Sequence, residues 1–154
     1  MRQFSVTRRL PFRATDLLAI AADVRRYPEF VPLCVGARVW DERSDAEGRR
    51  HFRAAFDVAY PKLRIAETLS SEVTVDPVAL WVRALSHSGP VRHLDNRWLF
   101  HELLRGGTDV DLWLAYEMSS RPLKLLMSGM FDYAMRKIIN AFEERAYALY
   151  EPVG

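Results

Sequence analysis

Histidines are the residues of this chain that could most readily hold a metal ion, but their spacing argues against it. The four are His51, His87, His93 and His101, and none belongs to an H-x-x-x-H or C-x-x-C pattern. His93 and His101 lie eight residues apart in one predicted strand, so about 26 Å separates them on the same face. We therefore expect no metal site.

Catalytic side chains are equally sparse. Asp109 and Asp111 share one strand face beside a turn, where a solvated role is expected rather than an acid and base pair. Cys34 has no histidine nearby in the sequence to activate it, so a small buried hydrophobe is its expected role. No G-x-S-x-G, G-x-x-x-x-G-K-[ST] or G-x-G-x-x-G motif occurs. We expect no catalytic residue, no catalytic cofactor and no enzyme activity.

Length and composition indicate a single globular domain that comprises residues 1–154. The chain has 49% hydrophobic and 27% charged residues. The net charge of +2 is too small to indicate a DNA partner. Nineteen of the 22 cationic residues are arginine, which binds phosphates in bidentate fashion. The arginine pairs at 8–9, 25–26 and 49–50 are far apart in sequence, so solvated ends of elements are expected and a phosphate-binding patch is the alternative.

The expected location is the cytoplasm. No apolar run reaches the roughly 20 residues that span a bilayer, and residues 1–4 lead directly into strand-like sequence. A single cysteine allows no intramolecular disulfide, which agrees with a reducing compartment.

Hydrophobic periodicity predicts an α+β order of elements. Residues 3–12 form a strand, a helix begins at Thr15 or Asp16 and ends before Pro28, and a second short helical turn covers 29–33. Alternating patterns and turn signals then predict further antiparallel strands, six or seven in all, within residues 35–43, 49–61, 63–75, 79–85, 91–104 and 109–119.

The C-terminal part is predicted to be one amphipathic helix of about 28 residues, about 40 Å long. Ser119 and Ser120 supply the N-cap signal, and Pro122 lies in the first turn. Its apolar stripe comprises Leu123, Met127, Met130, Phe131, Ala134, Ile138, Ala141, Phe142 and Leu149. The expected fold is a curved antiparallel sheet around this helix, with two short helices after the first strand.

Such a sheet leaves a cavity beneath the helix unless large side chains fill it. Met127, Met130 and Met135 would face the sheet, and methionine adapts to irregular space. These methionines could simply fill the core. The alternative is that they form the wall of a pocket for a flexible apolar ligand. The inward sheet positions that would contribute are Phe56, Val58, Trp98, Phe100 and Tyr116.

Three segments resemble the coenzyme Q-binding family of START-like (helix-grip) proteins. "YPEFVPLC" at 27–34 is similar to that family's "YPxFLPWC", and "SGPVRHLDNRWLF" at 88–100 to its "GPFKxLxxxWxF". "AFEERAYALY" at 141–150 is similar to "AFxxRAxxxY". Leu33 stands where the family often has tryptophan and Val91 where it often has phenylalanine, so the changes affect ligand choice more than fold.

The resemblance implies a non-enzymatic domain that binds ubiquinone or a related polyprenyl lipid and supports respiration and quinone biosynthesis. A ligand of this kind implies transient peripheral contact with the inner membrane. The same pattern covers a toxin-like bacterial branch that acts on the association of ribosomal subunits, so a ribosomal subunit is the alternative partner. Some START-like proteins are enzymes of the cyclase or dehydratase type, so such an enzyme is the third hypothesis.

The candidate ligand site follows from the pattern and the resemblance together. Pro28 and Pro32 stiffen the segment 27–34, which we interpret as one lip of the cavity mouth; a tight connection that caps the sheet is the alternative. Position alone makes Tyr60, Tyr116, Asn96 and Arg97 candidate donors to a quinone oxygen. The predicted ligand-binding residues are Tyr27, Phe30, Val31, Leu33, Phe56, Val58, Leu94, Trp98, Phe100, Tyr116, Met127, Met130, Phe131, Ala134 and Ile138.

Overall fold

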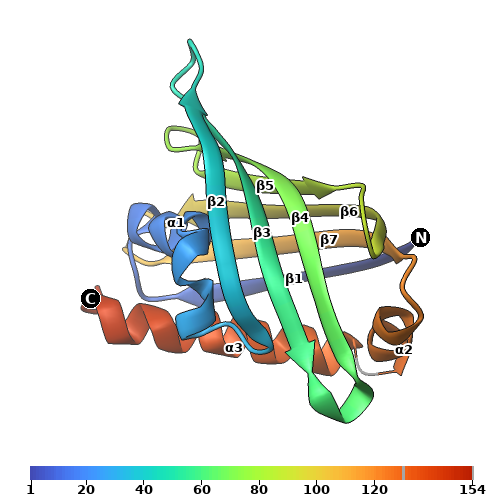
Figure 1. Cartoon of the computed structure of the whole chain (residues 1–154). Helices are drawn as coiled ribbons and strands as arrows, with labels where there is room; N and C mark the ends of the chain where they lie inside the picture. The colour runs from blue at the N-terminus through green and yellow to red at the C-terminus, as the bar shows by residue number, and fades with distance from the viewer. Residues whose placement is uncertain (130, 154) are drawn as a thin grey trace.

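A curved antiparallel sheet lies over the C-terminal helix in the computed structural model (Figure 1). The structure describes residues 1–129 and 131–153, without the side chains of Leu126 and Met127. The seven strands lie in the order β1-β7-β6-β5-β4-β3-β2. Their bounds are β1 Arg2–Leu10, β2 Cys34–Ser44, β3 Arg50–Tyr60, β4 Ile65–Asp76, β5 Trp81–Ser86, β6 Val91–Glu102 and β7 Thr108–Met118. The predicted fold class is confirmed.

Helices occupy the connection from β1 to β2, the short connection from β3 to β4 and the C-terminal part of the chain. They are α1 Ala14–Ala22, a 3-10 helix at Val24–Glu29, a 3-10 turn at Pro61–Leu63, α2 Arg121–Gly129 and α3 Phe131–Leu149. Within the described residues, no helix is both long enough and apolar enough to cross a bilayer.

The helix predicted from Thr15 or Asp16 begins earlier, at Ala14, and its N-cap residue is Arg13. No side chain of the cap residue bonds to the helix. The Ala14 amide instead donates to a Glu102 carboxylate oxygen at 3.3 Å, so an acceptor on β6 satisfies one of the N–H groups at the start of the helix. The local sequence could not show this distant acceptor.

A second short helix follows α1, as predicted, but its predicted bounds of 29–33 are wrong. The 3-10 helix lies earlier, at Val24–Glu29, and contains Pro28. Pro32 disfavours helical backbone at the preceding residue, and Leu33 has a φ of +68°, outside the right-handed region. The chain therefore leaves the helical conformation before β2 begins.

The C-terminal segment forms two helices where one continuous helix was predicted. In Figure 1, α2 and α3 point in clearly different directions, and α3 runs beneath the sheet. Gly129 is the last described residue of α2. Met130 lies outside the described residues.

The inward residues of the sheet agree with the predicted alternation. On β7 all five predicted inward side chains, from Val110 to Met118, are buried. At the α1 end of the concave face, Phe12 is fully buried and its ring meets that of Tyr147 edge-on, with centroids 4.9 Å apart. Leu10, Leu17 and Ala146 are also at most 1% exposed, so solvent does not reach this part of the core.

Candidate functional site

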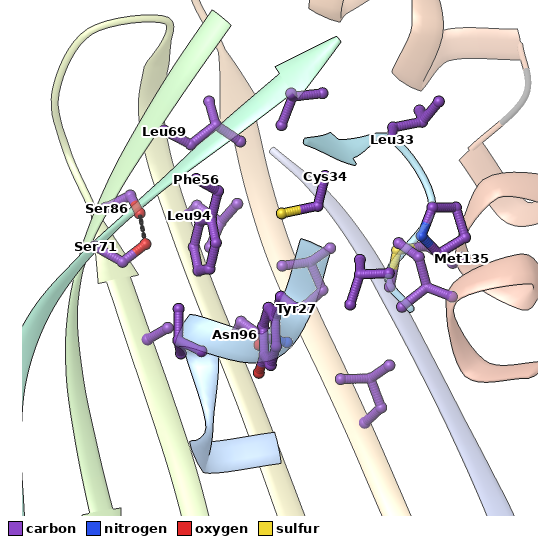
Figure 2. Close-up of a pocket in the computed structure, with 18 of the residues that line it drawn as sticks. Tyr27, Leu33, Cys34, Phe56, Leu69, Ser71, Ser86, Leu94, Asn96 and Met135 are labelled. Atoms are coloured by element: carbon purple, nitrogen blue, oxygen red, sulfur yellow. Dashed lines mark hydrogen bonds between the residues drawn. The ribbon is translucent and has the colours of Figure 1, made fainter. Parts of the chain in front are cut away.

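A cavity of about 280 Å³ lies between the concave face of the sheet, the segment 27–34 and α3 (Figure 2). This volume is at the lower end of the range found for small-molecule sites. Among the described residues that line it, none carries a charged side chain, and nearly all are aliphatic or aromatic. The predicted space beneath the helix is therefore present and apolar.

Most of the predicted ligand-binding residues meet at this cavity. Those that line it are Tyr27, Phe30, Val31, Leu33, Phe56, Val58, Leu94, Trp98, Phe131, Ala134 and Ile138. Met130 and the side chain of Met127 lie outside the described residues. The lining is a geometric result, and the role of these residues in binding a ligand stays a prediction.

Phe100 and Tyr116 face inward as predicted but do not line the cavity. The Phe100 ring stacks on that of Trp98 at 6.2 Å, and the Tyr116 ring packs against that of Phe131 at 4.5 Å. Both side chains are buried behind lining residues. Strand alternation identifies the inward face, but it does not show which inward side chains another ring covers.

The segment 27–34 is both a core connection and a wall of the cavity, so the two alternative interpretations describe the same structure. The Tyr27 ring stacks on that of Phe56 at 5.7 Å and meets that of Phe30 edge-on at 5.8 Å. The Tyr27 hydroxyl donates to the Ala21 carbonyl, and burial raises the pKa of Tyr27. The Arg145 guanidinium lies 5.1 Å above the Phe30 ring. These contacts hold the segment in place.

Two serines missed by the sequence interpretation supply polar groups to the wall. Ser71 on β4 and Ser86 on β5 are buried, and their hydroxyl oxygens are 2.6 Å apart, as the dashed line in Figure 2 marks. A signal was available for Ser71, because it has the same strand parity as the inward residues Leu69 and Val73.

Of the four suggested donors to a quinone, Asn96 lines the cavity. Its amide nitrogen donates to the Trp113 carbonyl at 3.2 Å, and its amide oxygen accepts from the Trp98 indole at 2.9 Å. Arg97 instead pairs with Asp95 at 2.9 Å, on the opposite face of the sheet. Tyr60 and Tyr116 are absent from the lining. Sequence position therefore identified one polar wall residue among four candidates.

Groups able to do acid and base chemistry are scarce in the cavity. Cys34 lines it, and burial raises the pKa of its thiol, which favours the neutral form. Over residues 1–129 and 131–153, no three histidine, cysteine or acidic side chains gather as metal ligands. The rings of His87 and His93 lie 5.3 Å apart, a proximity that the sequence spacing did not suggest.

Comparison with curated proteins finds relatives of two kinds. The chain is 32% identical to the ribosome association toxin RatA of Vibrio cholerae, over 97% of this chain and 99% of that protein. It is 30% identical to the mitochondrial coenzyme Q-binding protein COQ10 homolog B of Xenopus laevis, over 96% of this chain and 59% of that protein. A coenzyme Q-binding protein of Schizosaccharomyces pombe is 27% identical over 93% and 85% of the two chains.

Solved structures share the fold. An 18 kDa protein from Caulobacter crescentus superposes with a TM-score of 0.78 at 29% identity, covering 97% of this chain and 98% of that one. A START superfamily protein from Mycobacterium smegmatis has a TM-score of 0.75 at 17% identity, over 96% and 99% of the two chains. An aromatase/cyclase from a Streptomyces has a TM-score of 0.73 at 17% identity, over 95% and 93%. The last two show likeness of fold alone.

A family model agrees with these likenesses. The model described as polyketide cyclase/dehydrase and lipid transport matches residues 10–143. Because this span covers most of the chain, the protein belongs to the polyketide cyclase/dehydrase and lipid transport family and has its START-like helix-grip fold.

Proposed function

We propose that this protein binds ubiquinone or a related polyprenyl lipid in the cavity and acts as its carrier or chaperone, in support of respiration and quinone biosynthesis. The observation that carries the proposal is the apolar cavity of about 280 Å³ with no charged side chain among its described lining residues. Relatives named as coenzyme Q-binding proteins support the same ligand class.

The physical chemistry of the cavity favours an uncharged, largely hydrocarbon ligand. Burial of each CH₂-sized unit contributes about 0.8 kcal/mol, so several prenyl carbons can bind without strong polar contacts. A carboxylate or phosphate would lose its hydration without gaining an ionic partner from the described wall, which is costly. Because a polyprenyl ligand resides in the bilayer, the proposal includes transient contact of the protein with a membrane surface.

The pairing of the arginines makes ribosome association the second candidate rather than the first. At least twelve of the nineteen arginines lie within 4.0 Å of an acidic side chain. These pairs neutralise much of the charge that phosphate binding would use. The similarity to proteins named as ribosome association toxins is the observation that supports ribosome association as the second candidate.

An enzymatic function has weaker support. The titratable side chains among the described lining residues are Tyr27 and Cys34, and burial raises the pKa of both. Neither is therefore ionised as a general base at neutral pH. The curated relatives carry names of binding proteins and toxins, while the cyclases share the fold alone.

The test is extraction of the purified protein with organic solvent, followed by mass spectrometry and by titration with decylubiquinone. The proposal predicts a co-purifying quinone from a quinone-producing host and saturable binding of decylubiquinone. Empty preparations that also fail to bind added quinone would end the carrier proposal. Co-sedimentation with ribosomal subunits that weakens steeply with salt would favour the second candidate.

A further inference from the structure

The Ser71–Ser86 pair is an unusual feature of an otherwise apolar wall. The two residues are 7% and 3% exposed, and they lie on the adjacent strands β4 and β5 near the middle of the sheet. Burying a hydroxyl among hydrocarbon groups is unfavourable unless it is hydrogen-bonded. Two alanines at these positions would avoid that cost, so the hydroxyl pair calls for a physical explanation.

The pair has hydrogen-bonding capacity to spare. Two hydroxyls carry two protons, and their mutual bond at 2.6 Å uses one of them. In the described part of the chain, neither serine oxygen forms another side-chain hydrogen bond. Asn96 differs, because its amide nitrogen and oxygen already bond to Trp113 and Trp98. The serine pair can therefore offer one more donor to a molecule in the cavity.

The position of the serine pair determines which way a bound ligand would point. In Figure 2 the two hydroxyls lie on the sheet wall, across the open space from Leu33 and Met135. Both serines are buried, whereas Val31, Pro32 and Leu33 at the other side are partly exposed. A polar head at the serines would place an attached tail toward the segment 27–33.

We infer that the Ser71–Ser86 pair anchors the head of an uncharged ligand by donating a hydrogen bond to one carbonyl oxygen. The head then lies against β4 and β5, and the apolar tail points toward the segment 27–33. The inference rests on the proposed function and adds to it the orientation of the ligand and the chemistry of its head. A quinone and any other neutral carbonyl lipid offer this same acceptor.

The experiment compares ligands that have a carbonyl group with one that has none. Dissociation constants are measured for decylubiquinone, 2-dodecanone and decylbenzene with the wild-type protein, a Ser71→Ala/Ser86→Ala variant and a Ser70→Ala control. Ser70 neighbours Ser71 on β4 but belongs to the opposite face of the strand, so it is a matched control. Replacing both partners of a hydrogen bond with apolar groups of similar shape is well tolerated, so the double variant should fold.

The wild-type protein and the control should bind decylubiquinone about tenfold more tightly than decylbenzene. The double variant should lose this preference and bind decylbenzene at least as tightly as before. A similar preference for 2-dodecanone would assign the anchor to neutral carbonyl lipids in general, and its absence would assign the anchor to quinones.

Infrared spectra of bound decylubiquinone provide a second measurement, which reports on the carbonyl group directly. The carbonyl stretch should move to lower frequency in the wild-type protein, and the shift should vanish in the double variant. An unshifted stretch, or equal affinity of the wild-type protein for decylubiquinone and decylbenzene, would overturn the anchor and leave the carrier function standing. Failure of the wild-type protein to bind any of the three ligands would instead overturn the proposed function itself.

Discussion

The two ends of the concave face use the same sheet and the same helix for different purposes. At the α1 end, Leu10, Phe12 and Ala146 are essentially inaccessible to solvent. At the other end, Leu94 on β6 and Ile138 on α3 remain partly exposed, because both line the cavity. The closed α1 end and the open end therefore differ in how completely side chains fill the space between the sheet and α3.

The boundary between the two ends is aromatic. The Trp98 ring lines the cavity, and it also packs against that of Phe142 on α3 at 4.9 Å and stacks on that of Phe100. Beyond this boundary toward α1, the small void beside Leu10 and Ile139 measures about 10 Å³, too little to hold more than a water molecule. Three rings therefore separate the packed core from the cavity.

Loss of a large side chain from the closed end should have the largest effect on stability. Phe12→Ala removes a fully buried ring that packs on Tyr147 and should reduce the free energy of unfolding by about 3–5 kcal/mol. Urea unfolding measures this loss. Phe30→Ala at the open end is the counterpart and should cost less than half as much. Equal losses would mean that the two ends are packed alike.

The same enlargement at the two ends should have opposite consequences. Ala84 lines the cavity on β5, whereas Ala146 on α3 is 0% exposed. Ala84→Phe should fill the cavity, weaken decylubiquinone binding at least tenfold and leave the unfolding free energy within about 1 kcal/mol of the wild type. Ala146→Phe should overpack the core and destabilise the fold by about 1–3 kcal/mol.

Ligand titration together with thermal unfolding of both variants checks this pair of expectations. Retained binding by a folded Ala84→Phe variant would place the ligand elsewhere. A stable Ala146→Phe variant would show that the α1 end has unused space.

The stability of the protein should depend on pH through a cluster of charged side chains on the outer face of the sheet, behind the cavity wall. Asp95 alternates with the lining residues Leu94 and Asn96 and is bonded by Arg83 and Arg97, both at 2.9 Å. Burial raises the pKa of Asp95, but the hydrogen bonds from the two arginines outweigh it and hold the pKa below its usual value. The resulting stabilisation is present above the unfolded pKa of about 3.9 and is lost as the pH falls through the lower folded value.

Asp95→Asn should therefore destabilise the protein modestly at pH 7, and the difference from the wild type should shrink as the pH falls below about 4. Unfolding free energies of both proteins at pH 7 and pH 3 measure the change. Glu144→Gln, at an exposed position on α3, is the control and should show little effect at either pH. A difference that stays constant with pH would contradict the role assigned to the Asp95 carboxylate.

Sequence pattern alone determined the order of the strands and the position of α1, and it identified the inward faces of β3 and β7. Strand alternation is a property of the backbone, so Val110, Leu112 and Leu114 could be assigned to the interior without knowledge of their neighbours. The same local rule, together with the family resemblance, identified most of the residues that line the cavity. Helix boundaries were less predictable, because the acceptor for the Ala14 amide comes from Glu102 on a distant strand.

Only the tertiary structure decided where the interior is filled and where it is open. That outcome depends on how side-chain volumes from α1, α3 and the sheet add up in one space, which no single segment encodes. It also brought Ser71 and Ser86 together from adjacent strands, 2.6 Å apart. A hydroxyl pair forms through registration of strands, so its chemistry belongs to the fold rather than to either stretch of sequence.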